Sequence, residues 1–197
     1  LLPELPEVET YARDLDRLLR GCTFTGARVG WPAQLAGEDP GTFASRLSGR
    51  QVRGVTRRGK HLVLQLDDGA LVLHLRMSGR PIVAGAGEPV DPHAHLVLGL
   101  TGGRELRLRD PRKFGRAWLV ADPQTVLGRL GPEPLDPAFT ADALARRLGA
   151  RRCRLKPLLL DQEFVAGLGN IYVDESLWAA RLHPQRRADE VGRPGAL

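Results

Sequence analysis

The spacing of apolar residues predicts an α-helix close to the start of the chain. Between residues 7 and 20 these residues recur every three or four positions, so that they share one face of a helix. Pro6 before this stretch and Gly21 after it favour the beginning and the end of a helix. We therefore predict an amphipathic first helix. Its apolar face consists of Val8, Tyr11, Leu15, Leu18 and Leu19.

Short alternating or apolar segments follow as far as residue 120, and this pattern is typical of β-strands. The turn-forming sequences at 67–69 (DDG) and 101–103 (TGG) separate neighbouring segments, as expected for tight hairpins. We predict an antiparallel β domain in which neighbours in the sequence pair as in a meander. The expected strands are 23–29, 51–56, 61–66, 70–75, 95–100, 104–108 and 116–120.

The pattern becomes helical after residues 131–134 (GPEP), which interrupt the alternation. Thr140 is expected to cap a helix that runs to Leu148 with Gly149 as its stop. A turn at 167–170 (GLGN) separates two further expected helices, and the polar tail has no expected partner elements. These later segments are 155–164, 172–180 and the tail 184–197; the expected domains are 1–133 and 134–197.

The charge of the chain favours a polyanionic partner. The sequence has 29 Lys and Arg against 23 Asp and Glu, a formal net charge of +6, which fits nucleic acid but also an Arg-rich genome. No apolar run approaches the roughly 20 residues that cross a membrane, and no signal peptide is recognisable, so we expect a soluble intracellular protein. Two cysteines, Cys22 and Cys153, exclude a four-thiolate zinc site within this chain and make a disulfide framework equally improbable.

Short motifs carry the candidate chemistry. Residues 3–7 (PELPE) place a proline and two carboxylates before the first helix, although acidic residues there could serve the helix dipole alone. Three other motifs follow in order at 74–79 (HLRMSG), 110–115 (DPRKFG) and 167–176 (GLGNIYVDES). Together these motifs resemble the formamidopyrimidine-DNA glycosylase family, and the resemblance covers the chain from residue 3 to about residue 184.

The resemblance implies an α+β fold. It consists of an N-terminal antiparallel β-sandwich with flanking helices, the catalytic domain over 1–133, and a partial helix-two-turn-helix (H2TH) DNA-binding domain over 134–197. The family's later helices and its C-terminal four-cysteine zinc finger are missing here, so we expect C-terminal truncation and no cofactor in this chain. Lost phosphate contacts, including that of the finger arginine that assists δ-elimination, imply weak DNA binding, and the C-terminal end is not expected to fold fully.

In such an enzyme Pro3 would be the nucleophile, attacking C1′ of the damaged nucleotide. A terminal amine titrates near neutrality and is nucleophilic without a partner base, and the resulting iminium makes the C2′ proton acidic, so that the strand can be cut. The resemblance makes Glu4 the general acid, Glu7 a supporting acid, and Lys60 a residue of β-elimination and phosphate contact. Taken alone, Lys60 would belong to a solvated basic hairpin.

An enzyme that acts at C1′ must extrude the nucleotide, and the resemblance assigns the filling of the resulting gap to Met77, Arg112 and Phe114. Taken alone, Met77 and Phe114 would more often be core residues. Asn170 could also be a plain helix cap, and either His93 or His95 could simply pack. The residues expected to grip DNA are His74, His93, Arg112, Arg151 and Asn170.

The resemblance therefore predicts a monomeric, bacterial, cytoplasmic and nucleoid-associated base excision repair enzyme without membrane contact. It would remove oxidised purines (8-oxoguanine and formamidopyrimidines) from double-stranded DNA and act as a lyase by β,δ-elimination. One departure matters: Leu1 and Leu2 precede Pro3, and if they are retained the Pro3 nitrogen is an amide without a nucleophilic lone pair. An upstream start assignment or a non-AUG codon would explain them. The alternatives are an endonuclease VIII-like enzyme for oxidised pyrimidines, a non-catalytic damaged-DNA-binding protein, and an RNA-binding helix-turn module.

Overall fold

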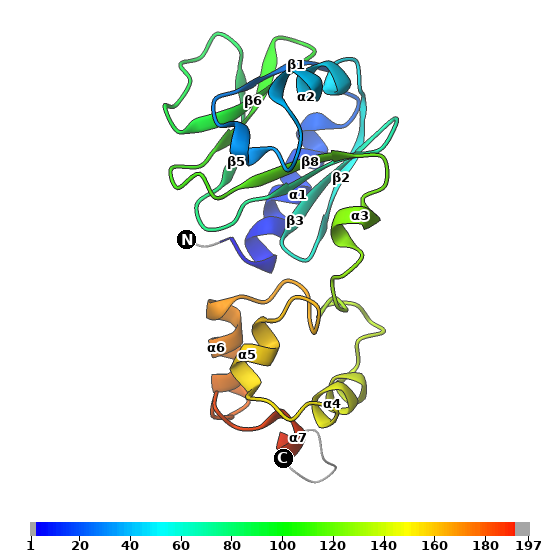
Figure 1. Ribbon diagram of the computed structural model, residues 1–197, viewed down its shortest axis with the longest axis vertical. Helices are drawn as coiled ribbons and strands as arrows, with labels where there is room; N and C mark the ends of the chain where they lie inside the picture. Colours follow the sequence, from blue (N-terminus) through cyan, green and yellow to red (C-terminus); the bar gives the residue numbers. More distant parts are fainter. Residues whose placement is uncertain (1–2, 192–197) are drawn as a thin grey trace. The chain divides into compact units, whose positions relative to one another are not determined.

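Residues 3–191 are described by a computed structural model, in which the chain folds as two units, Leu1–Gly128 and Arg129–Leu197 (Figure 1). The β-strands of residues 3–191 all lie in the first unit, and the second is helical. The separation falls a few residues before the expected boundary between 133 and 134. Within residues 3–191, no helix combines the length and the apolar character that a bilayer span requires.

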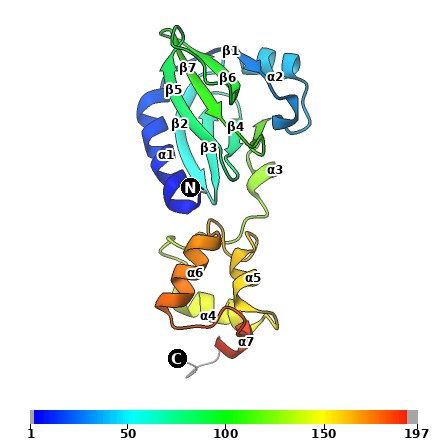
Figure 2. The ribbon, with the colours of Figure 1, turned by 90° about the vertical axis from the view of Figure 1, so that its left-hand side faces the viewer.

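The first unit is a sandwich of two four-stranded antiparallel sheets, as the resemblance implies (Figure 2). Helix α1 (Leu5–Leu19) packs against strands β2 and β3, and helix α2 (Pro40–Leu47) packs against β1. One sheet has the order β1 (Phe24–Val29), β6 (Ala94–Leu100), β7 (Arg104–Arg109), β5 (Arg80–Gly85). The other has the order β2 (Val52–Arg58), β3 (His61–Leu66), β4 (Ala70–His74), β8 (Arg116–Val120).

A single apolar core joins both sheets and α1. Leu62 and Leu64 on β3 alternate with residues of the other face, and each is fully buried, because successive side chains of a strand point to opposite faces. The turn of the β3–β4 hairpin depends on Gly69, whose φ is 81° and whose added Cβ would lie 2.3 Å from the Val120 carbonyl oxygen. Other members of this core are Val8, Leu15, Leu19, Leu71, Leu73, Leu96, Leu98 and Leu106.

The meander expectation is confirmed for β2–β3–β4 and for β6–β7, and it is wrong elsewhere, because β1 pairs with β6, β5 with β7, and β4 with β8. The sequence pattern also missed β5, a short edge strand that contains Pro81, a residue typical of edge strands only. Helix α2 was missed although its start signals are present: Asp39 accepts hydrogen bonds from the Gly41 and Thr42 amides, and Pro40 follows it. The short helices η1 (Pro32–Gln34) and α3 (Gln124–Leu127) complete the unit.

The second unit contains α4 (Ala141–Gly149), α5 (Leu155–Leu160), α6 (Asn170–Ala179) and α7 (Ala188–Val191). Thr140 caps α4 as predicted, by accepting a hydrogen bond from the Ala143 amide. Helix α5 ends before residue 164 because Asp161 begins a turn in which its side chain accepts from the Glu163 amide. The tail is not without partners: Ala188 is buried, and α7 packs against α4.

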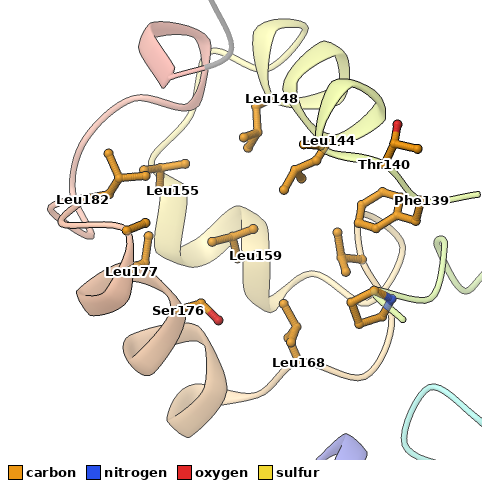
Figure 3. Close-up of a pocket in the computed structure, with 14 residues that line it drawn as sticks. Phe139, Thr140, Leu144, Leu148, Leu155, Leu159, Leu168, Ser176, Leu177 and Leu182 are labelled. Carbon is orange, nitrogen blue, oxygen red and sulfur yellow. The ribbon is translucent and has the colours of Figure 1, made fainter. Parts of the chain in front are cut away.

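The core of the second unit is open on one side. A pocket of about 320 Å³ lies among α4, α5 and α6, and its lining is mainly apolar (Figure 3). Leu144, Leu159 and Leu177 point into it from the three helices. Helical packing within this unit therefore leaves part of its apolar surface uncovered.

Candidate functional site

The beginning of α1 holds Pro3 and Glu4 in fixed positions. Both residues are buried, and Glu4 is 3% exposed. Glu4 is the N-cap of the helix, and it forms a capping box with Glu7: the Glu4 amide donates to the Glu7 carboxylate at 3.0 Å, and the Glu4 side chain accepts from the Glu7 amide. Leu1 and Leu2, whose retention would make the Pro3 nitrogen an amide, lie outside the described residues.

The turn between β2 and β3 brings Lys60 close enough to Glu4 for their charges to interact. Gly59 permits this turn, with a φ of 56°. Burial lowers the pKa of Lys60; the Glu4 carboxylate opposes this effect, and Arg76 adds to it. A lysine with a lowered pKa is uncharged more often than a solvated one, and its neutral form can accept a proton. Lys60 is therefore not the solvated lysine of a basic hairpin that the sequence alone would suggest.

Two histidines lie beside Lys60 as a cross-strand pair. His61 on β3 and His74 on β4 are register partners, and their ring centroids lie 4.5 Å apart, edge to face. The pKa of His61 is lowered to about 4 and that of His74 to about 3, mainly by burial. The positive charges of Arg76 and Lys60 contribute to both shifts, and His61 contributes to that of His74. Both rings are therefore neutral near pH 7. His74 Nδ1 accepts a hydrogen bond from the Arg76 amide at 2.9 Å, so the His74 proton resides on Nε2.

Two large apolar side chains are exposed next to this group. Met77 is 39% exposed and Phe114 is 45% exposed, so neither is a core residue. Together with Arg76 and Arg116 they line a pocket of about 340 Å³. The guanidinium of Arg112 lies over the Phe114 ring, 4.9 Å from its centroid. Exposed apolar side chains among arginines form a surface suited to stacked bases and phosphates.

Comparison with known proteins identifies the family. The sequence model of the formamidopyrimidine-DNA glycosylase N-terminal domain matches residues 2–117, and that of the formamidopyrimidine-DNA glycosylase H2TH domain matches residues 130–195. The chain belongs to the formamidopyrimidine-DNA glycosylase family. The formamidopyrimidine-DNA glycosylase of Herpetosiphon aurantiacus is 48% identical over 195 residues, which cover 96% of this chain and 71% of that protein. The Geobacillus kaustophilus protein of the same name is 50% identical over 192 residues, covering 95% and 70%.

Solved structures of the family share the fold. An inhibited LlFpg, in complex with DNA that contains N7-benzyl-Fapy-dG, superposes with a TM-score of 0.90 at 34% identity, covering 98% of this chain and 73% of that one. The Lactococcus lactis formamidopyrimidine-DNA glycosylase, bound noncovalently to DNA with an AP site, has a TM-score of 0.87 at 35% identity, covering 95% and 73%. The β-sandwich and the H2TH unit of this glycosylase are thus established features of its family.

Two charged residues within the sequence motifs, Arg76 and Lys113, were not among the predicted site residues. Arg76 lies within the HLRMSG motif with a φ of 55°, and its charge acts on Lys60, His61 and His74. Lys113 lies within DPRKFG with a φ of 58°, and its ammonium group is 4.7 Å from the centroid of the Trp31 ring. Positive φ values at residues other than glycine are costly and occur often at functional sites. No sequence signal marks them.

The remaining predicted residues divide between the two units. His93 is exposed in the first unit, whereas His95 is the more buried of the two histidines, and burial lowers its pKa. Arg151 follows α4 in the second unit, where it is exposed and lines a pocket of about 470 Å³ together with Arg146 and Arg147 of α4. Asn170 is exposed in the first turn of α6, but it is not the N-cap, because Gly169 occupies that position. The structure groups the rest in the first unit: Pro3, Glu4, Glu7, Lys60, His74, Met77, Arg112 and Phe114.

The described residues do not fit a metal site. Across residues 3–191 there is no group of three or more His, Cys, Asp or Glu side chains that could hold an ion. Cys22 is buried in the first unit and Cys153 is exposed in the second, and both are free thiols. A zinc finger of the family therefore has no ligand set within these residues.

Proposed function

We propose that this glycosylase removes oxidised purines, 8-oxoguanine and formamidopyrimidines, from double-stranded DNA and then cleaves the strand as an AP lyase. The observation that carries the proposal is the charge interaction between Lys60, a lysine of lowered pKa, and the buried carboxylate of Glu4, the residue that follows Pro3. The relatives bound to damaged DNA support the choice of partner. We further propose that the protein acts as a monomer on nucleoid DNA.

In the first step the amine of Pro3, freed of Leu1 and Leu2, attacks C1′ of the damaged nucleotide. The nitrogen lone pair forms the N–C1′ bond, the C1′–base bond breaks, and the base leaves with the electron pair of the C1′–base bond. Glu4 supplies a proton to the departing base or to O4′ of the sugar, and the proton lost by the amine passes to the other of these two. The C1′–O4′ bond breaks as the nitrogen lone pair forms the C=N bond, which leaves an iminium. The capping box restrains the side chain of Glu4, the residue that follows the reacting nitrogen in the sequence.

In the second step the iminium makes the C2′ proton acidic. Removal of this proton gives an enamine, in which C1′=C2′ has formed and the iminium electron pair has returned to nitrogen. The nitrogen lone pair then re-forms the iminium, the C2′=C3′ bond forms, and the C3′–O bond breaks, so that the 3′ phosphate leaves with the electron pair of that bond. We assign Lys60 to this elimination and to contact with a phosphate, because its lowered pKa increases the fraction that can accept a proton. A second, δ-elimination releases the 5′ phosphate, and hydrolysis of the iminium then restores the amine.

Recognition requires that the damaged nucleotide leave the base stack. We propose that Met77 and Phe114 fill the gap and that Arg112 hydrogen-bonds the orphaned base, which agrees with their exposure and with the Arg112–Phe114 contact. The proposed DNA contacts also include residues of both units. They are His74, as a neutral donor, His93, Arg112, Arg151 and Asn170.

The decisive experiment is borohydride trapping with two forms of the protein, the chain as it stands and a chain that begins at Pro3. Each is incubated with duplexes that carry 8-oxoguanine or an oxidised pyrimidine. We expect a covalent adduct only for the form that begins at Pro3, and only with the purine lesion; acetylation of its amino terminus should abolish the adduct. Adduct with the pyrimidine lesion alone would establish the endonuclease VIII-like alternative. Binding without adduct in both forms would establish a non-catalytic protein.

A matched pair of lysine variants tests the lyase step. Lys60→Ala should slow strand cleavage at a preformed abasic site by roughly a hundredfold, the usual contribution of a positioned acid–base group. Lys156→Ala removes a lysine that pairs with Asp174 at 2.8 Å in the second unit, and it should leave the cleavage rate unchanged. If Lys60→Ala cleaves the abasic strand as fast as Lys156→Ala and the wild type, Lys60 has no part in the mechanism.

A further inference from the structure

A buried carboxylate connects the two loops that carry the exposed apolar side chains. Asp110 is completely buried at the start of the loop 110–115. Its Oδ1 atom accepts a hydrogen bond from the Ser78 hydroxyl, in the loop 75–79, and its Oδ2 atom accepts one from the Gly115 amide at 2.6 Å. Hydrogen bonds to an ionised acceptor are stronger than neutral ones. One side chain thus joins the two loops.

The Ser78 hydroxyl has a second partner in the other loop. While it donates to Asp110, it accepts a hydrogen bond from the Arg112 amide at 3.3 Å. The backbone of Asp110 adds two more links: its amide donates to the His93 carbonyl at 2.8 Å, and its carbonyl accepts from the Lys113 amide at 3.1 Å. Segments that are distant in sequence therefore meet at Asp110, and each is bound to it directly.

The residue before each exposed apolar side chain has a strained backbone. Arg76 precedes Met77 with a φ of 55°, and Lys113 precedes Phe114 with a φ of 58°. Side-chain-bearing residues rarely adopt this conformation, and they retain it only where the surroundings hold them. The amide of Lys113 is held by the Asp110 carbonyl, so the same network supports the backbone that directs Phe114.

The space around the carboxylate is closely packed. A Cβ on Gly115 would lie 3.0 Å from Asp110 Oδ2 and 3.2 Å from Gln34 Nε2, so only glycine fits there without displacement of a neighbour. Gln34 is 1% exposed, and among the described residues neither of its side-chain polar atoms has a hydrogen-bond partner. The loop 110–115 therefore rests on a tightly filled base and has little room to shift.

We propose that Asp110 and Ser78 are positioning residues that hold Met77 and Phe114 at a fixed separation before DNA is bound. The inference rests on the proposed function, in which these two side chains enter the duplex where a nucleotide is extruded. Preorganised side chains insert without the entropic cost of ordering two loops on binding. Contacts to phosphates are electrostatic and do not depend on whether the two loops are ordered beforehand. Loss of the link should therefore weaken binding to a duplex with a gap in its stack and spare binding to intact duplex.

The test compares Ser78→Ala with Ser45→Ala, a matched control in α2 whose exposed hydroxyl contacts only its own helix, at the Thr42 carbonyl. The probes are a duplex with a tetrahydrofuran abasic analogue opposite 2-aminopurine and the same duplex undamaged. Neither measurement needs a free Pro3 amine. We expect Ser78→Ala to raise the Kd for the abasic duplex by roughly tenfold, to leave the Kd for intact duplex within about twofold, and to reduce the 2-aminopurine fluorescence change. Ser45→Ala should match the wild type.

Two further variants keep the outcome decisive. Ser78→Thr retains the hydroxyl and should recover the difference in Kd between abasic and intact duplex. Asp110→Asn retains the size of the side chain and one acceptor oxygen, so it should lose only part of this difference. Asp110→Asn also tests the proposal if Ser78→Ala does not fold. Equal weakening of both duplexes, or unchanged discrimination in folded Ser78→Ala and Asp110→Asn, would overturn the positioning role alone. A wild type that binds abasic and intact duplex equally would overturn the proposed recognition as well.

Discussion

The two units of this glycosylase differ in how completely they bury their apolar side chains. In the first unit, leucines of both sheets and of α1 form one closed core that includes Leu64, Leu71 and Leu73, each at most 1% exposed. In the second unit the buried cluster is smaller and borders an apolar pocket of about 320 Å³. The proposed chemistry is therefore built on the unit whose core is complete.

The difference begins in the sequence of the elements. Strands of the first unit place apolar residues at alternate positions, so two sheets can close over a common interior. Helix α6 instead buries Val173 and Leu177 while Ile171 and Trp178 remain 44% and 83% exposed. Helix α6 thus carries apolar residues on more than one side, and a short helical unit cannot bury all of them.

The largest expected effect compares one leucine from each core. Leu73→Ala should reduce the free energy of unfolding by about 4 kcal/mol, because it leaves a cavity in a closed core. Leu177→Ala should cost about 2 kcal/mol, the transfer term alone, because its side chain already borders a pocket. Hydrogen exchange read on peptides of each unit measures both. Equal costs would show that the pocket is closed in solution.

Acid should destabilise the first unit next most strongly. The folded pKa values of about 4 for His61 and about 3 for His74 lie below the unfolded value of 6.5, so the unfolded chain binds more protons between these limits. Stability is therefore fully present above pH 6.5 and falls as the pH decreases, by on the order of 3 kcal/mol for each histidine near pH 4. Urea denaturation at a series of pH values measures the slope. His61→Gln should flatten it, and a slope that this variant leaves unchanged would assign the acid sensitivity to other groups.

A smaller effect is expected at the start of α4. Thr140→Ala removes the acceptor of the Ala143 amide and should cost the second unit about 1 kcal/mol, while Thr140→Ser retains the acceptor and should cost little. Protection of the α4 amides from hydrogen exchange is the appropriate measurement. If α4 loses no protection in the alanine variant, packing rather than capping determines where this helix begins.

The smallest effect concerns an exposed ion pair in the second unit. Arg129 and Glu163 lie 2.7 Å apart, but their side chains are 88% and 54% exposed, so solvent screens their attraction. Arg129→Ala should change the free energy of unfolding by less than about 0.5 kcal/mol. Thermal unfolding at low and high salt measures it. A larger, salt-sensitive loss would show that surface charge compensates for the incomplete core of this unit.

Local signals in the sequence predicted the first helix, the hairpin turns and the Thr140 cap, because each depends on residues a few positions apart. The pairing of β1 with β6 and the existence of β5 depend on contacts between distant segments, which periodicity does not encode. The same distinction holds for the candidate site. Resemblance supplied the motif residues, whereas the linking role of Asp110 and the neutral state of His74 arise from burial and tertiary contacts.

The capping box at Glu4 has a consequence for the temperature range of the proposed chemistry. The Pro3 nitrogen belongs to the ring and the backbone, so no side-chain torsion can reorient it. Its orientation depends on the backbone of Glu4, which the hydrogen bonds with Glu7 hold in place. Fraying of a single helical turn would then misdirect the amine while both sheets remained intact. Turnover should fail on heating before the sandwich melts.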